Sequence, residues 1–245
     1  MVSFAAEPVV NIGFFSVTNT FIHTLLVDGI IIAACLYLRN KITIIPGKIQ
    51  NITEFVIDSF YKLSESIAQE RGKKIFPYFM TFFLFILIAN WTALLPGFNV
   101  FGIKEHESLI PLLRGATSDV NVTFGLAIVS IVATHILSIR ILGIHEYLSR
   151  FFSLNPVYLF IGVLEIISEF TKVISLGFRL FGNIFAGEIV LGTVSGLFAF
   201  IVPLPFLTLE IIVGLVQALV FSILTLTFMT ILSAPHHEEA KEVRN

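Results

Sequence analysis

Hydrophobic residues gather in five zones along this chain, separated by more polar connections. The zones run from about 20 to 38, 75 to 95, 120 to 142, 156 to 200 and 204 to 232. A helix that crosses the apolar core of a membrane upright needs about 20 residues. We therefore predict an all-α, polytopic membrane protein with about five transmembrane segments.

The fourth zone has some 45 residues, which is too long for one upright helix. Pro203 and Pro205 follow it and mark a turn into the fifth zone. We predict that residues 156–232 form a hairpin of two long, tilted helices, and that residues 75–142 form a shorter helical hairpin before it. The first zone, residues 20–38, is expected to be a single span.

Between the first two zones, residues 49–70 alternate apolar and polar positions at helical spacing. This spacing gives a helix one apolar face, as in helices that lie on a membrane surface. A soluble helix packed on another subunit explains the pattern nearly as well. The apolar positions are Ile52, Phe55, Val56, Phe60, Leu63 and Ile67.

The composition supports the membrane class and excludes several functions. Of the residues, 56% are hydrophobic and 13% are charged, whereas soluble domains carry about 25% charged residues. A net charge of −2 leaves no electrostatic footprint for nucleic acid. No phosphate-binding Gly-x-x-x-x-Gly-Lys loop occurs in the sequence, and we predict neither a cofactor nor a metal site.

Basic residues predict the orientation. The connection between the second and third zones contains only Lys104 and Arg114, and the tail at 233–245 contains Lys241 and Arg244. The positive-inside rule then places the N-terminal segment, residues 1–19, outside and the tail inside. The most basic connection, between the first two zones, contains Arg39, Lys41, Lys48, Lys62, Arg71, Lys73 and Lys74.

A polar stripe follows the fourth zone. Its members are three or four residues apart, which is the spacing of one helical face. A polar face on an otherwise apolar helix is typical of an ion path or of a helix buried in a bundle. The members are Glu165, Ser168, Lys172, Ser175, Arg179 and Asn183.

Arg179 is the most informative member of this stripe. A guanidinium keeps its charge, and placing one in mid-membrane costs about 3 kcal/mol on insertion scales. No acid lies three or four residues away on either side. We therefore expect the partner charge to lie elsewhere, for example on another subunit.

A second polar group lies on the opposite side of the same helix. Glu188 is nine residues beyond Arg179, half a turn away. In the predicted hairpin it lies at a depth similar to that of Glu210, which shares a helix face with Gln217. Two neighbouring carboxylates in a membrane cannot both be charged without a large cost, so such a pair can pass protons. The two groups predict two half-paths with Arg179 between them.

Several motifs of this chain resemble those of subunit a of the F-type ATP synthase family. The run from Glu165 to Asn183 carries the specific motif Arg-Leu-Phe-Gly-Asn, and Ala-Gly-Glu ends at Glu188. Further similarity lies at Ala93–Gly97, at Ser118–Thr123 and at Gln217-Ala218. The resemblance covers almost the whole chain.

The resemblance implies a stator beside a rotating ring of c subunits, held by peripheral-stalk b subunits in an energy-coupling membrane, with H⁺ as the translocated ion. It implies that Arg179 faces the ring carboxylate and that Asn183 and Gln217 give polar support. Glu188 and Glu210 match a pair that in many relatives is one Glu and one His.

The resemblance also suggests residues that line the two half-paths. Asn90 matches an asparagine of the outer path. Asp119 is expected either to gather protons there or to cap the helix that follows it. The inner path would contain Glu165, Ser168, Lys172 and Ser175.

Two other function classes fit parts of the sequence. A secondary ion-coupled transporter with an anion or proton site at Arg179 would have an inverted repeat and paired broken helices, and we find no repeat. A purely structural membrane anchor would not need the polar stripe.

Overall fold

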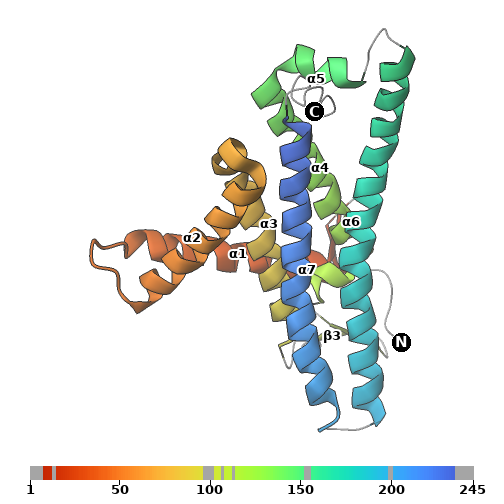
Figure 1. Cartoon of the computed structure of the whole chain (residues 1–245). Coiled ribbons are helices and arrows are strands. Elements are labelled where there is room, and N and C mark those ends of the chain that lie inside the picture. Colours follow the sequence, from red (N-terminus) through yellow and green to blue (C-terminus); the bar gives the residue numbers. More distant parts are fainter. Residues whose placement is uncertain are drawn as a thin grey trace.

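The computed structural model describes residues 8–12, 15–95, 102–105, 108–111, 114–151, 156–197 and 201–234. Residues 1–7, 13 and 14 of the predicted N-terminal segment and residues 235–245 of the predicted inner tail lie outside this range. The described chain is dominated by helices, so the all-α class is confirmed (Figure 1). The helices are α1 (Asn19–Asn40), α2 (Lys48–Ala68), η1 (Gln69–Arg71), α3 (Gly72–Ala93), η2 (Ala116–Ser118), α4 (Val120–Leu142), α5 (Ile144–Phe151), α6 (Pro156–Leu197) and α7 (Pro203–Leu232).

Four of the helical segments within the described ranges are long and apolar enough to cross a membrane. They are Asn19–Asn40, Lys48–Ala93, Val120–Leu142 and Pro203–Leu232. Helix α6 has 42 residues, which corresponds to about 63 Å at 1.5 Å per residue. This length is about twice the 30 Å of a membrane's apolar core, so α6 must tilt or extend beyond it.

Helices α6 and α7 run side by side in opposite directions, as the hairpin prediction requires (Figure 1). Helix α7 begins at Pro203, where the missing proline N–H costs no intrahelical bond. Helices α3 and α4 pack against this pair. One core cluster joins all four helices through Phe82, Phe83, Ile86, Ala127, Leu176, Leu180, Ala218 and Phe221.

Two short antiparallel hairpins occur between the helices and were not predicted. Strands β1 (Pro8–Ile12) and β2 (Phe15–Thr18) precede α1, and β3 (Gly102–Glu105) pairs with β4 (Ser108–Pro111) between α3 and α4. Strands of four or five residues are too short to stand out from a sequence read for spans of 20 residues.

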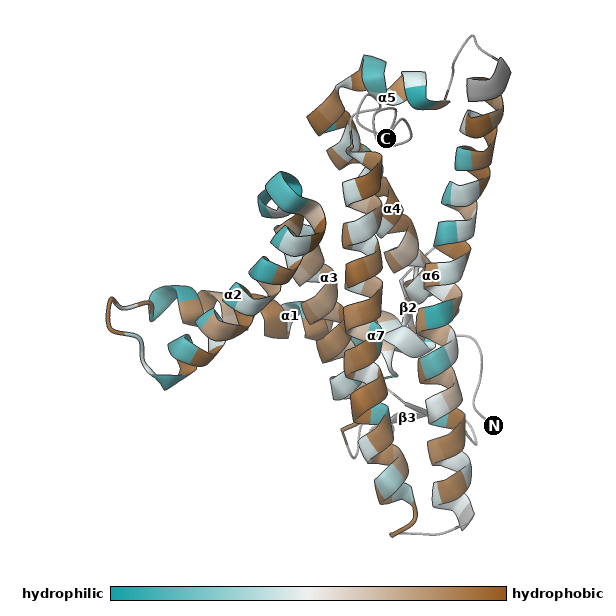
Figure 2. Cartoon of the chain, in the orientation of Figure 1, coloured by the Kyte–Doolittle hydropathy of each residue, from teal (hydrophilic) through white to brown (hydrophobic). Residues whose placement is uncertain are grey.

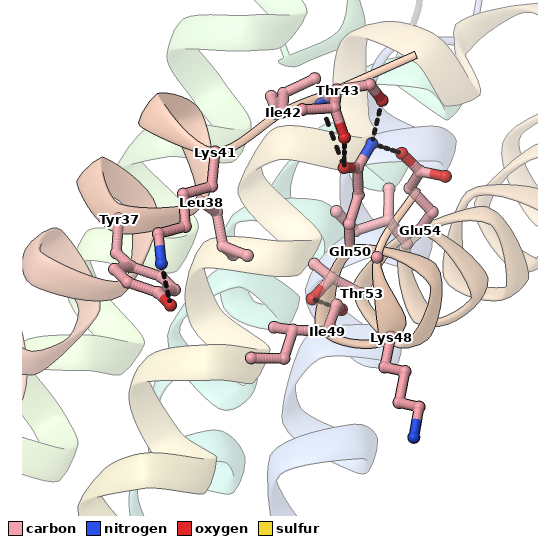
Figure 3. Close-up of a pocket in the computed structure, with 12 residues that line it drawn as sticks. Tyr37, Leu38, Lys41, Ile42, Thr43, Lys48, Ile49, Gln50, Thr53 and Glu54 are labelled. Carbon is pink, nitrogen blue, oxygen red and sulfur yellow. Dashed lines mark hydrogen bonds between the residues drawn. The ribbon is translucent and has the colours of Figure 1, made fainter. Parts of the chain in front are cut away.

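Helices α1 and α2 project away from the bundle (Figure 1). Only the first half of α1 is buried, through Asn19, Thr20, His23 and Val27. Beyond it, a pocket of about 590 Å³ lies between the end of α1 and α2 (Figure 3). The connection between the two helices is held by Gln50, whose amide nitrogen donates to Thr43 O at 3.0 Å and to Glu54 Oε1 at 2.7 Å.

Helix α2 occupies the range predicted for the amphipathic helix. Its end packs on the bundle, where Ser64 and Ala68 are buried and the Phe60 ring lies 4.7 Å from that of Phe83. Its first turns expose Ile52 and Phe55. No described residue covers this apolar side, so it fits either a membrane surface or another subunit.

Candidate functional site

Arg179 lies on the exposed side of α6. Its Nη2 donates to Ser175 Oγ at 3.2 Å, and both side chains are exposed. The core-facing side of the same turns is made by Leu176 and Leu180, which are 2% and 1% exposed. No carboxylate of the described residues forms an ion pair with Arg179. The guanidinium therefore points away from the bundle, toward whatever lies beside α6.

Asn183 lies one turn beyond Arg179 and is also exposed. Hydrophilic residues recur as separate bands along α6 among hydrophobic ones (Figure 2). The outward side of this helix also exposes large apolar groups such as Phe170, Ile174 and Phe178. A surface of this kind suits lipid or a partner protein better than water.

Glu188 and Glu210 come together at the other end of α6. Both line a small cavity of about 20 Å³ with Asn90, which leaves room for about one water molecule. The predicted hairpin therefore brings the two acids to one place. Ala93, Leu94 and Ile184 complete the lining.

The two carboxylates differ in their surroundings. Glu210 is 5% exposed and its Oε1 has no hydrogen-bond partner in the described chain. Its carboxylate lies directly over Gly187, where a Cβ would overlap it. Near Glu188 lie the Ser118 hydroxyl and the Arg114 guanidinium, which both favour its charged form.

Asn90 ties together three elements around Glu188 and Glu210. Its Nδ2 donates to Gly214 O on α7 at 3.1 Å, and its Oδ1 accepts from Thr117 Oγ1 on η2 at 2.7 Å. Gln217 follows Gly214 on α7 and is 9% exposed. The amide of Asn90 thus fixes the helix that carries Glu210 against the η2 turn that contacts Glu188.

Asp119 caps α4. Its Oδ1 accepts from Asn121 N at 2.9 Å, and its Oδ2 accepts from Thr20 Oγ1 of α1 at 3.0 Å. The capping alternative is therefore observed. His23 is buried next to this cap, with its Nε2 2.8 Å from Thr92 Oγ1 and its Nδ1 accepting from Ala116 N.

The first turns of α6 carry a different cluster, at the end where α5 lies. Glu165 Oε1 accepts from Arg150 Nε at 2.6 Å. Glu169 Oε1 accepts from Lys172 Nζ at 2.7 Å. The predicted single stripe is thus divided: Glu165 and Lys172 are half-buried among neighbouring helices, whereas Ser168 and Ser175 are exposed.

A family model described as ATP synthase A chain matches residues 20–230. The chain belongs to the ATP synthase A chain family. It is 30% identical over 219 residues to ATP synthase subunit a of Moorella thermoacetica, a match that covers 89% of this chain and 92% of that protein. It is 33% identical over 211 residues to ATP synthase subunit a of Geotalea daltonii, which covers 84% of each chain.

Membership in the ATP synthase A chain family confirms the resemblance that the motifs indicated. The matched range includes every candidate site residue. The chain is accordingly a multi-pass membrane protein, and both similar proteins come from bacteria.

Several polar residues near the family motif were missed by the sequence reasoning. Glu169 is four residues after Glu165 and three before Lys172, so the stripe's own spacing could have included it. His135 and Arg150 come from α4 and α5, and only the fold shows that they face α6. In the residues that the structure describes, no group of three or more His, Cys, Asp or Glu side chains could hold a metal ion.

Proposed function

We propose that this chain is the proton-conducting stator subunit in the membrane sector, Fo, of a rotary ATP synthase. The observation that carries the proposal is Arg179, a permanent cation that faces outward from α6 without an acid partner among the described residues. A charge at such a place needs water or a partner charge. A ring of c subunits with a carboxylate at the same depth would supply it.

The polar clusters at the two ends of α6 support two offset half-paths. The outer path would run through Glu188 and Glu210, with Asn90 and Gln217 holding the helices that carry them. The inner path would run along the first turns of α6. Arg179 lies between them, nine residues before Glu188.

The proposed cycle alternates the charge of the ring carboxylate. A proton from the outer path neutralises this carboxylate, which can then enter lipid because burying it no longer costs the desolvation of an ion. After nearly a full turn the ring site meets the inner path and releases the proton. Each charge that crosses contributes about 2.3 kcal/mol per 100 mV of membrane potential.

In this proposal Arg179 separates the half-paths. It attracts the ionised carboxylate and prevents protons from passing between the paths without rotation. ATP chemistry belongs to other subunits, and peripheral-stalk b subunits would hold the stator still. The excess of Lys and Arg in the connection between α1 and α3 supports an orientation with this connection and the C-terminal tail on the inner side.

The proposal is tested by Arg179→Ala in the complete complex, assayed in inverted membrane vesicles. We expect ATP-driven pumping and ATP synthesis to be lost while the complex still assembles. After the soluble sector is removed, passive proton permeability should rise. Arg179→Lys should also fail, because a compact ammonium does not reproduce the planar guanidinium.

The matched control is Arg140→Ala, since Arg140 is exposed at the last turn of α4. It should pump and synthesise as the unchanged complex does. Near-normal coupled synthesis in Arg179→Ala would overturn the proposed function.

A further inference from the structure

A second titratable cluster lies at the α5 end of α6 and is not used by the family motif. His135 of α4 has its Nε2 3.6 Å from Glu169 Oε2, and its Nδ1 lies 2.9 Å from Tyr147 Oη of α5. The Lys172 ammonium holds the other oxygen, Oε1 of Glu169. Helices α6, α4 and α5 thus contribute an acid, an imidazole and a phenol to one row of consecutive contacts.

Glu169 Oε2 is the open position in this line. It is buried and makes no hydrogen bond to any described residue, although a buried polar oxygen normally has a partner. Nε2 of His135 lies 3.6 Å from this oxygen, just beyond hydrogen-bond distance. The free oxygen therefore faces the group with which it can exchange a proton.

The imidazole can serve this exchange in one of its tautomers. When Nδ1 carries the hydrogen, Nδ1–H donates to Tyr147 Oη and the Nε2 lone pair faces Glu169 Oε2. Tyr147 lies on α5, outside the spanning helices, and burial raises the pKa of its hydroxyl above the ordinary value. The phenol therefore stays neutral and orients the ring.

The charged groups around this cluster have partners of their own, so Glu169 and His135 are the members that can exchange a proton. On α5, Arg150 pairs with Glu165. From α7, the Phe228 ring contributes an uncharged face, with its centroid 4.9 Å from Lys172 Nζ. Lys172 Nζ lies 2.7 Å from Glu169 Oε1. The side chains are reachable from outside, since Glu169 is 11% and His135 25% exposed.

We propose that Glu169 and His135 form the proton relay of the inner half-path, with Tyr147 as its positioning residue. A proton that arrives on Glu169 Oε2 moves to His135 Nε2, which gives a carboxylate and an imidazolium. The imidazolium then releases its Nδ1 proton to water at the α5 surface, and exchange of tautomers restores the starting state. No electron is transferred and no other bond changes.

The position of the relay fits the proposed cycle, on which this inference rests. Glu169 precedes Arg179 by ten residues and Glu188 follows it by nine, about 15 and 13.5 Å along a helix axis. Arg179 is thus nearly midway between two proton-exchanging carboxylates. Water at the exposed hydroxyls of Ser168 and Ser175 covers the distance from the ring site to Glu169.

The test uses the complete complex in inverted vesicles, where the inner surface faces the medium and its pH can be varied. We expect Glu169→Gln and His135→Gln each to slow proton flux about tenfold. The double variant should be no slower than Glu169→Gln alone, because both residues serve one step. In His135→Gln, the flux should lose its dependence on inner pH, since the imidazole is the group that releases the proton to the inner medium.

Matched controls come from α5. His145→Gln changes an exposed histidine and Glu146→Gln a half-buried glutamate, and both should leave the flux and its pH profile unchanged. Added imidazole should restore part of the flux in His135→Ala and none in Glu169→Gln. Neither a restored flux nor an altered pH profile follows if the cluster only holds the helices together.

Several outcomes separate this inference from the proposed function. If Arg179→Ala uncouples the complex while His135→Gln keeps the unchanged flux and pH profile, the relay is wrong and the proposed function stands. Multiplicative losses in the double variant would also overturn the relay. If Glu169→Gln fails to assemble, the pH profile and imidazole rescue of the His135 variants decide the question.

Discussion

The two ends of α6 solve the problem of buried carboxylates in opposite ways. At the outer end, Glu188 and Glu210 face one small cavity that Asn90 also lines, and Arg114 lies near enough to attract the charge of Glu188. At the inner end, each acid has its own cation within 2.7 Å: Arg150 for Glu165 and Lys172 for Glu169.

The difference has a physical consequence. A carboxylate paired with a cation is stable in its charged form, so Glu165 contributes fixed charge and holds α5 against α6. Two carboxylates that face each other exchange a proton more readily than they both ionise. In the proposed function the outer end therefore holds one shared proton, whereas the inner end has compensated charge with one open oxygen on Glu169.

The largest expected effect is at the outer pair. Glu188→Gln or Glu210→Gln should each lower the rate of ATP synthesis about 100-fold, within the usual contribution of a positioned acid or base. If the two share one proton, the double variant should lose little more than either single variant. The measurement is a double-mutant cycle on synthesis rate against outer pH.

Replacement of either outer acid by His should retain more synthesis than Gln, because histidine still carries a proton near neutral pH. Glu146→Gln, on α5 at the other end of α6, is the control. Independent, multiplicative losses would place the two acids in separate steps and remove the contrast with the inner end.

Part of this comparison could be predicted from the sequence. The approach of Glu188 to Glu210 followed from the prolines that begin α7, because a tight turn fixes which residues of a hairpin lie at the same depth. The charge of Arg179 was informative because its helix contains no acid within one turn. Both arguments need only one helix or one turn.

The inner cluster could not be predicted in the same way. Its arrangement depends on Arg150 and His135, which come from α5 and α4, and helical spacing on α6 says nothing about their positions. The half-burial of Lys172 beside exposed Ser168 likewise depends on where α7 packs. The η2 turn, with Thr117 and Ser118, was missed because three residues give no periodic signal.

A smaller effect should follow from crowding the outer pair. In Gly187→Ala, the new Cβ would overlap the Glu210 carboxylate. The carboxylate can move aside at little cost in stability, since it ends a flexible side chain, but it then leaves Glu188. We expect synthesis to fall roughly tenfold with normal assembly, because misplacement by about 1 Å is costly for reacting groups.

The control for this change is Gly192→Ala on the same helix, where a Cβ meets nothing within 4 Å. It should be neutral. Unchanged synthesis in Gly187→Ala, with the protein assembled at the usual level, would mean that the position of the Glu210 carboxylate does not limit proton entry.

The smallest effect on proton flux is expected at the inner ion pair. Arg150 bridges α5 to Glu165, and its Nη1 also donates to Ile231 O at the end of α7 at 3.2 Å. Arg150→Gln should therefore act on stability, by about 1–3 kcal/mol, less than the full cost of breaking a buried pair because both groups keep some exposure. Proton flux at the assay temperature should stay within about threefold of the unchanged complex, while the temperature at which pumping is lost should fall by several degrees.

Arg140→Gln, at an exposed arginine of α4, should change neither quantity. A large loss of flux with unaltered thermal stability would instead place the Arg150–Glu165 pair in the proton path, and the inner end would then resemble the outer one more closely than its compensated charges indicate.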